Sequence, residues 1–283
     1  MQIPFLFTPY LHEIMDTIQP GTIDYLAKLN YHPRDEDITF EPEPHIYTVN
    51  GDRGGYTSVT TWNHEHFTNF DTDGVITNIL NGSKWANDPD YAYYKMTREE
   101  MRELWHKNAK NSSDLGTELH NDIEKYYNGM DVPNQSVEYG FFKLFLKDFD
   151  LKPYRTEWMI YHEEMMLTGT VDMLYENPDG TLQIYDWKRS KEIKFETYNN
   201  YSKTPCISHL PNTNFWHYSL QLNMYRTILE QKYEKQITDM YLVIMHPDYP
   251  YKTYQRIEVP FLRKEMDNLV ELRLKQVDEA KSK

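Results

Sequence analysis

The sequence predicts an α+β fold in which helices flank a mixed central β-sheet. Three observations predict it: helical segments precede a run of three strands, a helix follows that run, and two more strands and a helix follow. The expected elements are helices over 113–127 and 137–149, strands over 155–161, 168–176 and 181–188, a helix over 215–231, strands over 237–246 and 253–259, and a helix from Phe261. Ser113 or Asp114 can cap the first helix, and Asn128-Gly129 can end it.

Residues 1–112 are expected to form an accessory region ahead of a core over residues 113–283. Short β-like runs over 38–40, 45–49 and 56–59, with turn signals at Asn50-Gly51 and Gly54-Gly55, predict a small β-meander. The following stretch, over 61–110, has a helical pattern and many aromatic residues. These aromatic side chains could stack on unpaired bases or pack a small core, and both interpretations stay open.

Length and cysteine content limit the class of protein. A chain of 283 residues with 39% hydrophobic content can bury one large core. No apolar stretch is long enough to cross a membrane, and the opening residues lack the basic start of a secretory signal. The single cysteine, Cys206, excludes a disulfide framework and any multi-cysteine zinc or iron-sulfur site. We therefore expect an intracellular protein that is not secreted.

The net charge of -14 is unusual for a protein that binds nucleic acid, because phosphate contacts come from Lys and Arg. A cation-binding site itself requires carboxylates, and local charge matters more than the sum. A basic run of Lys188, Arg189, Lys191 and Lys194 ends one predicted strand. It could contact DNA or form a solvated strand end.

The clearest chemical signal is Asp186-Trp187-Lys188. Asp186 and Lys188 are two residues apart in a predicted strand, so their side chains project from the same face. Asp172 lies on the preceding strand, and a five-residue loop over 177–181 would place it opposite Asp186. A four-residue loop would pair Asp172 with Tyr185 on the other face. We predict the five-residue or bulged register, with the two acids about 5 Å apart.

Two acids in this position predict a metal site. Buried carboxylates without a partner are unfavourable, and a hard divalent cation satisfies them, so we expect Mg²⁺, with Mn²⁺ as an alternative. A carboxylate-held metal ion can support phosphodiester hydrolysis, and Lys188 would orient the water and stabilise the developing charge. The competing interpretation is a surface hairpin whose Asp and Lys are solvated, because Asp-x-Lys tripeptides are common.

Two helices add candidate residues. Gly116, His120 and Glu124 recur every four residues and line one face, so a neutral His120 imidazole could complete the metal coordination. A lone helical histidine also commonly serves packing. Gln221 and Tyr225 share a face of the later helix, which is equally the pattern of an amphipathic helix with a polar edge.

Five segments of the chain carry a resemblance to a known family. They are Gly116-Thr117-Glu118-Leu119-His120 with Glu124, then Glu157, then Gly169-Thr170-Val171-Asp172, then Asp186-Trp187-Lys188, then Gln221-Leu222-Asn223-Met224-Tyr225. In this order they resemble the RecB-type branch of the PD-(D/E)xK nuclease superfamily, over residues 113–246. The Asp-Trp-Lys tripeptide and the residues around Tyr225 are also similar to mitochondrial genome maintenance exonucleases and to phage and large-virus relatives.

The resemblance implies a restriction-endonuclease-like core and a metal-dependent DNA nuclease of replication, repair or recombination. The implied roles are metal ligation by His120, Asp172 and Asp186, catalysis by Lys188, support by the acid of Glu157, positioning by Gln221 and Tyr225, and DNA contact by Thr117, Arg189, Lys191 and Lys194. Taken from its position alone, Glu157 could instead pair with a neighbouring basic residue.

The relatives suggest exonuclease action on DNA ends, single strands or flaps. A structure-specific endonuclease and a catalytically inactive DNA-binding protein of the same fold are the alternatives. Cys206 alone cannot build the four-cysteine iron-sulfur cluster of some RecB-type nucleases. No Gly-x4-Gly-Lys-[Ser/Thr] phosphate loop occurs, so cutting should not require ATP bound by this chain. The sequence gives no indication of protein partners.

Overall fold

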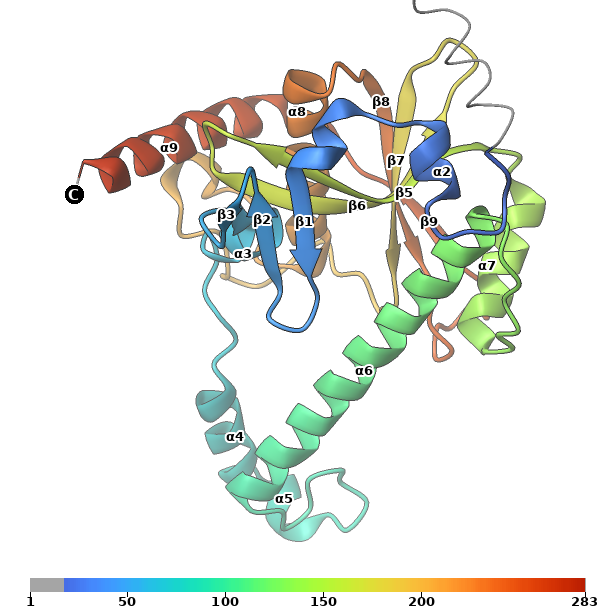
Figure 1. Ribbon diagram of the computed structural model, residues 1–283. Helices are drawn as coiled ribbons and strands as arrows, with labels where there is room; N and C mark the ends of the chain where they lie inside the picture. The colour runs from blue at the N-terminus through green and yellow to red at the C-terminus, as the bar shows by residue number, and fades with distance from the viewer. Residues whose placement is uncertain (1–17, 283) are drawn as a thin grey trace, which may run out of the picture.

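A computed structural model describes residues 18–282, and a six-stranded mixed sheet forms its centre (Figure 1). The predicted α+β class with a mixed central sheet is confirmed. Across residues 18–282, no helix combines the length and apolar character that a bilayer span requires. The opening segment, used above against a secretory signal, lies outside the described residues.

The strands of the central sheet are β4 (Thr57–Ser58), β5 (Lys152–His162), β6 (Leu167–Glu176), β7 (Leu182–Lys188), β8 (Ile237–Ile244) and β9 (Gln255–Glu258). Their order is β4-β6-β7-β8-β9, with β5 paired to β6. The β4–β6 and β7–β8 pairs are parallel, and the others are antiparallel. Leu174 pairs with Ile184 and Glu176 with Leu182, so the five-residue loop and its register are confirmed. Gly180 supplies the positive φ of +84° that this turn requires.

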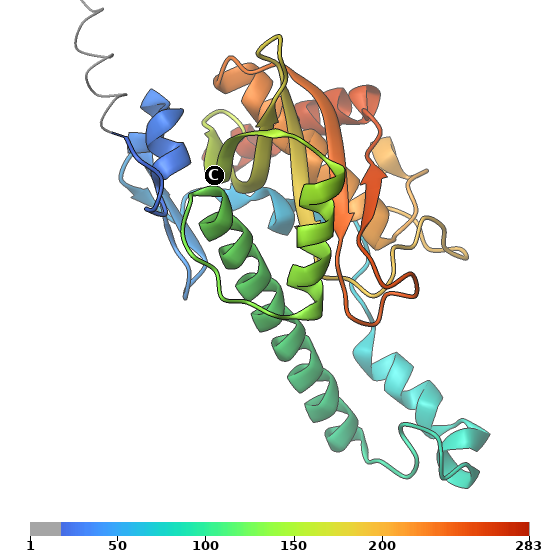
Figure 2. The ribbon, with the colours of Figure 1, turned by 90° about the vertical axis from the view of Figure 1, so that its right-hand side faces the viewer.

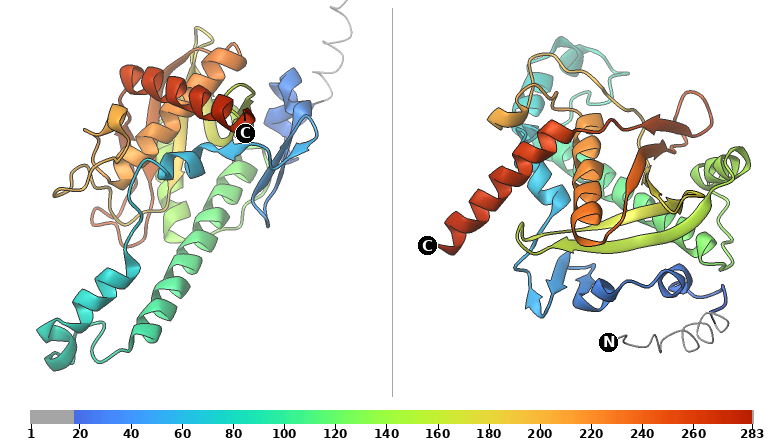
Figure 3. Two further views of the ribbon diagram at one scale, coloured as in Figure 1. Left: turned by 90° about the vertical axis from the view of Figure 1, so that its left-hand side faces the viewer. Right: turned by 90° about the horizontal axis from the view of Figure 1, so that it is seen from above.

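Helices cover both faces of the sheet (Figure 3). One face packs against α6 (Arg98–Tyr127) and α7 (Val137–Asp148), where Phe142 and Phe145 contact Trp187. The other face packs against α8 (Asn214–Lys232) and α9 (Arg263–Lys281). The buried helical residues enclose β7 from both sides, which is what holds the predicted acidic strand in place.

The helix expected to begin at Ser113 begins at Arg98, so its predicted start was wrong. Thr97 caps it: the Thr97 hydroxyl accepts from the Glu100 backbone N–H, and the Glu100 carboxylate accepts from that of Thr97. With α4 (Thr72–Leu80) and α5 (Ser83–Asn87), the first half of α6 projects from the body of the molecule (Figure 2). We call residues 72–112 the arm. The predicted boundary between residues 112 and 113 crosses α6, and the division into two regions stays a prediction.

The predicted β-meander is right in two strands and wrong in the third. Its strands are β1 (Ile38–Glu41), β2 (Ile46–Val49) and β3 (Asp52–Arg53). The run over 56–59 instead leaves the meander: β4 pairs with β6 in the central sheet, and Val59 begins α3 (Val59–His64). The reason is local, because the Ser58 hydroxyl accepts from the Thr61 backbone N–H and caps that helix.

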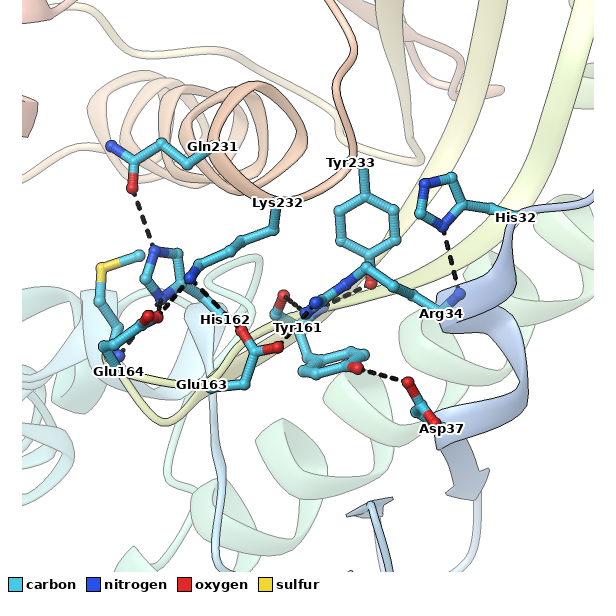
Figure 4. A network of polar contacts seen from close by, with 11 residues as sticks. His32, Arg34, Asp37, Tyr161, His162, Glu163, Glu164, Gln231, Lys232 and Tyr233 are labelled. Atoms are coloured by element: carbon cyan, nitrogen blue, oxygen red, sulfur yellow. Dashed lines mark hydrogen bonds and ion pairs between the residues drawn. The ribbon is translucent and has the colours of Figure 1, made fainter. Parts of the chain in front are cut away.

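The N-terminal segment with α2 (Tyr25–Leu29) and η1 (Pro33–Asp37) docks firmly on the core (Figure 4). The Arg34 guanidinium lies 3.8 Å from the centre of the Tyr161 ring and donates to Glu163 Oε1 at 2.6 Å. Glu164 beside it pairs with Lys232 at the end of α8. These acids are therefore engaged by basic side chains, and the network fastens the N-terminal segment to β5 and α8.

The remaining short helix, η2 (Pro205–Ile207), lies in the predicted loop between β7 and α8. The loop is otherwise irregular apart from a single bridge between Tyr201 and Pro211. It runs past α3, because Ser202 and Lys203 hydrogen-bond to the carbonyl of His66. The loop thus packs against the segment that follows α3.

Candidate active site

The sheet opens where the predicted acids lie. One edge of β6 pairs with β5 from Leu167 to Glu176. On the opposite edge of β6, β4 pairs at Leu167 and Thr168, and β7 pairs only from Met173 onward. Within the described chain, the segment over 169–172 has no strand partner on that second edge. The next residues in the β6–β7 register are Asp172 and Asp186, so both acids lie where the strands separate.

Asp172 is held by the neighbouring strand. Its side chain is 9% exposed, and its Oδ2 accepts a hydrogen bond of 2.9 Å from the Trp187 backbone N–H. Because the donor is a backbone group of the neighbouring strand, this hydrogen bond fixes the direction of the carboxylate.

Asp186 and Lys188 form a buried ion pair. The Lys188 Nζ lies 2.7 Å from Asp186 Oδ2, and the side chains are 18% and 2% exposed. The ammonium also lies 4.8 Å from the centre of the Tyr218 ring. The two side chains therefore project from the same face of β7, as predicted.

His120 and Glu157 complete the cluster. His120 Nδ1 lies 3.4 Å from Glu157 Oε1 and 3.5 Å from Asp172 Oδ2, while its Nε2 is 2.8 Å from the Trp187 carbonyl oxygen. Because a carbonyl can only accept, Nε2 carries a proton and Nδ1 faces the acids. Glu157 has a φ of +42°, a left-handed conformation that costs about 1–3 kcal/mol in a non-glycine residue. This strain lies directly at the cluster, as strain often does at functional sites.

Gln221 and Tyr225 reach the site from α8. Gln221 Nε2 lies 3.2 Å from the Tyr225 hydroxyl and 3.5 Å from Asp186 Oδ1. The Tyr225 ring packs directly on Gly169, where a Cβ atom would lie 2.3 Å from Tyr225 Cε1. Gly169 therefore permits the close approach of α8 to the gap in the sheet.

Burial and neighbouring charges shift the pKa values of the site. Burial by itself would lower the pKa of His120, but Asp172 and Glu157 outweigh it and raise that pKa to about 9. Burial raises the pKa of Asp186 to about 6, opposed by Lys188 and reinforced by Asp172, and burial also raises the pKa of Asp172. Burial would lower the pKa of Lys188, but the two aspartates outweigh it and raise it, so Lys188 is an ammonium ion. The site is a poorly hydrated concentration of negative charge.

The donor set fits a divalent cation. One ligand atom each from His120, Glu157 and Asp172 lie within 4.8 Å of one another. Asp186 lies beside this group, and despite the Lys188 ion pair its buried Oδ2 accepts no hydrogen bond of good geometry from any residue in 18–282. Carboxylate oxygens are the donors that Mg²⁺ and Mn²⁺ prefer, and a bound cation would offset the desolvation of these acids.

The residues predicted to contact DNA lie around this cluster, and they differ in how strongly other side chains already engage them. Thr117 is exposed on α6, one turn before His120. Arg189 is largely buried and pairs with Glu138 at 2.5 Å, so its guanidinium is already engaged. Lys191 and Lys194 are exposed and pair with the equally exposed Asp248 and Glu192. Such surface pairs contribute little and exchange readily for phosphate, so a role in DNA contact remains a prediction for these two lysines.

Two aromatic residues at the site were not among the predicted ones. The Tyr47 hydroxyl of β2 lies 2.9 Å from Thr170 Oγ1, next to Asp172. No sequence signal indicated it, because Tyr47 belongs to the meander that was assigned to the accessory region. Tyr218, beside Lys188, did have a signal, since it precedes Gln221 by three residues and so shares the helix face of Gln221 and Tyr225.

Comparison with known proteins agrees with this geometry. The family model of the PD-(D/E)XK nuclease superfamily matches residues 96–281, about two thirds of the chain. No curated protein sequence matches the chain. The matched range contains both strand acids, the lysine, His120 and the α8 pair. The chain therefore belongs to the PD-(D/E)XK nuclease superfamily of metal-dependent nucleases.

Proposed function

We propose that this protein is a Mg²⁺-dependent deoxyribonuclease, an exonuclease of the RecB-type branch that acts at DNA ends or single-stranded flaps. The observation that carries the proposal is the convergence of Asp172, Glu157 and His120 beside the Asp186–Lys188 ion pair. The exposed lysines beyond β7 would add phosphate contacts despite the acidic net charge. The composition and the single cysteine support an intracellular role in DNA repair, recombination or replication.

The residues divide the chemistry as follows. Asp172, Glu157, Asp186 and the neutral form of His120 would hold the cation, so binding would release the proton from His120 Nδ1; the bound cation would polarise the phosphate and activate water. Lys188 cannot accept a proton while it is an ammonium ion, so it donates hydrogen bonds to the attacking water or to a non-bridging phosphate oxygen. Gln221 fixes the orientation of Asp186, and Tyr225 fixes Gln221.

A digestion panel tests this proposal. End-labelled linear single-stranded, duplex and flap DNA and circular single-stranded DNA are incubated with Mg²⁺, with Mn²⁺ and with chelator. We expect metal-dependent release of short products from linear substrates and an intact circle. Cleavage of the circle would show an endonuclease, and no metal-dependent cleavage of any substrate would favour the inactive DNA-binding alternative. An RNA copy of the linear strand serves as the control for sugar specificity.

A further inference from the structure

Two adjoining cavities extend from the candidate active site along α3 and the start of α8. The first, of about 420 Å³, is lined by Lys188 and Gln221 of the site and by Asn63, His64, Asn214 and His217. The second, of about 580 Å³, shares His64 and His217 with the first and continues to Phe67 and Phe70. Each has the volume of an ordinary ligand site. The shared residues place the two cavities side by side, with Lys188 in the lining of the first and Phe70 in the lining of the second.

The lining of these cavities carries little charge. Of the described residues that line them, Lys188 is the only lysine or arginine and Asp71 the only carboxylic acid. Side-chain amides take their place, from Asn63, Asn69, Asn200, Asn212 and Asn214. Phosphates are bound mainly through Lys and Arg, whereas amides pair well with base edges. Asn200, Asn212 and Asn214 already hydrogen-bond within the protein, so Asn63 and Asn69 are the amides better placed to meet a ligand. A lining of this composition suits the bases of a strand better than its backbone.

Two side chains of the lining, Asn63 and His217, retain hydrogen-bonding capacity. Asn63 is 3% exposed, and its Nδ2 donates no hydrogen bond to any residue within 18–282. Burial, with a smaller contribution from His64, lowers the pKa of His217 to about 4, so its ring is neutral at pH 7. His217 Nε2 lies 2.9 Å from Asn212 Oδ1, which places the proton on Nε2 and leaves Nδ1 as an acceptor. One buried donor and one acceptor therefore line the path.

Aromatic rings line the far part of the path. The Phe67 ring centre lies 4.2 Å from that of His217. Phe70, at the base of the arm, is 70% exposed although it is large and apolar. Exposed aromatic faces of this kind stack on unpaired bases without sequence preference.

We propose that the two cavities form a groove for the bases of an unpaired DNA strand that runs from the active site to Phe70. The inference rests on the proposed nuclease function and specifies which part of the substrate must be single-stranded. In a duplex the base edges are already paired and the base faces stacked, so a duplex end would have to open before its strand enters the groove.

Kinetics on two kinds of substrate test the groove. A p-nitrophenyl ester of thymidine 5′-phosphate reaches the metal site but not the groove, whereas oligodeoxythymidylates of increasing length fill it. We expect the wild-type KM to fall with oligonucleotide length. In Phe70→Ala the KM for the longest strand should rise about tenfold, while its kcat and the hydrolysis of the ester stay unchanged. The tenfold factor should persist at higher salt, since no phosphate contact is lost.

Two variants control the comparison. Tyr251→Ala removes an aromatic side chain that is 76% exposed outside both cavities, and it should match wild type on every substrate. Phe70→Trp should restore the low KM because it restores a stacking surface. A wild-type KM that is independent of strand length, or equal behaviour of Phe70→Ala and Tyr251→Ala, would overturn the groove.

A binding measurement distinguishes failure of the groove proposal from failure of the nuclease proposal. If wild type hydrolyses neither the ester nor the strands with Mg²⁺ or Mn²⁺, the nuclease proposal fails. A 2-aminopurine oligonucleotide bound in the presence of Ca²⁺ then still reports on the groove. Fluorescence quenched by wild type and restored in Phe70→Ala supports base stacking, and equal fluorescence with both proteins refutes it.

Discussion

The two ends of α6 are built in different ways. At the C-terminal end, Leu119 and Ile123 are buried against the central sheet, and His120 between them faces the acids of the site. At the N-terminal end, Met101 is buried in the arm. Between Met101 and Leu119 every residue of the helix is exposed or half-buried.

Different interactions hold the two ends. The C-terminal end depends on tertiary packing across a sheet, whereas the arm depends on local contacts: the Thr97 capping box and the 2.5 Å ion pair between Arg102 and Asp73 of α4. A helix that is polar on all sides gains little from tertiary burial, so it connects two regions without fixing them equally. We call the part of the molecule around the central sheet the body. We expect the reacting residues and most of the stability to lie in the body, and the arm to be more mobile.

Removal of the Lys188 ammonium group should have the largest effect. Lys188→Ala deletes the group that would stabilise the transition-state charge, and we expect kcat for DNA cleavage to fall by about 10²–10³. The matched change in the arm, Lys107→Ala, alters an exposed side chain and should leave kcat within a few-fold of wild type. An equal loss in both variants, measured with end-labelled DNA, would contradict the division between body and arm.

A pair of glycine substitutions should change stability in opposite directions. Gly169→Ala forces a Cβ atom against Tyr225, and we expect unfolding in urea to require about 1–3 kcal/mol less free energy. Gly116→Ala lies within α6 where a Cβ atom meets no atom of residues 18–282 within 4 Å, so it should stabilise the protein by about 0.5–1 kcal/mol. If Gly169→Ala left the stability unchanged, the contact between Gly169 and Tyr225 that brings α8 to the candidate active site would not be tight.

Hydrogen exchange should reveal the smallest difference, within one helix. Amides of α6 from Leu119 to Tyr127 lie against the sheet and should exchange only through large openings, whereas those from Arg98 to Lys110 should open at lower free energy. Exchange resolved by mass spectrometry of peptides measures both ends together. Equal protection would mean that the arm and the body unfold as one unit.

The central hairpin was predictable because its constraints are local. A five-residue loop and a period of two fixed which side of β7 carries Asp186 and Lys188, and both the register and the shared face are as expected. The start of α6 was missed although Thr97 and Glu100 form a capping box in the sequence. The polar residues that follow have no apolar period, and an apolar period is the signal from which a helix is predicted in a sequence.

The contributions from distant segments could not be predicted. Tyr47 reaches Thr170 across a long sequence separation, and β4 joins β6 rather than the meander next to it. Nothing in the local residues encodes such pairings, because they depend on how the whole N-terminal segment docks on β5. For the same reason, Arg189 could be counted as basic but not recognised as the partner of Glu138.

The length of the exposed middle of α6 also determines the angle at which the arm projects around the helix axis. Met101 and Leu119 are eighteen residues apart, which in an ideal helix is five full turns and about 27 Å, so both point to the same side. Inserting one residue between them would swing the arm by about 100° around the helix axis, whereas inserting seven would lengthen it and nearly restore its heading. The number of residues in this stretch thus determines the direction in which the arm points.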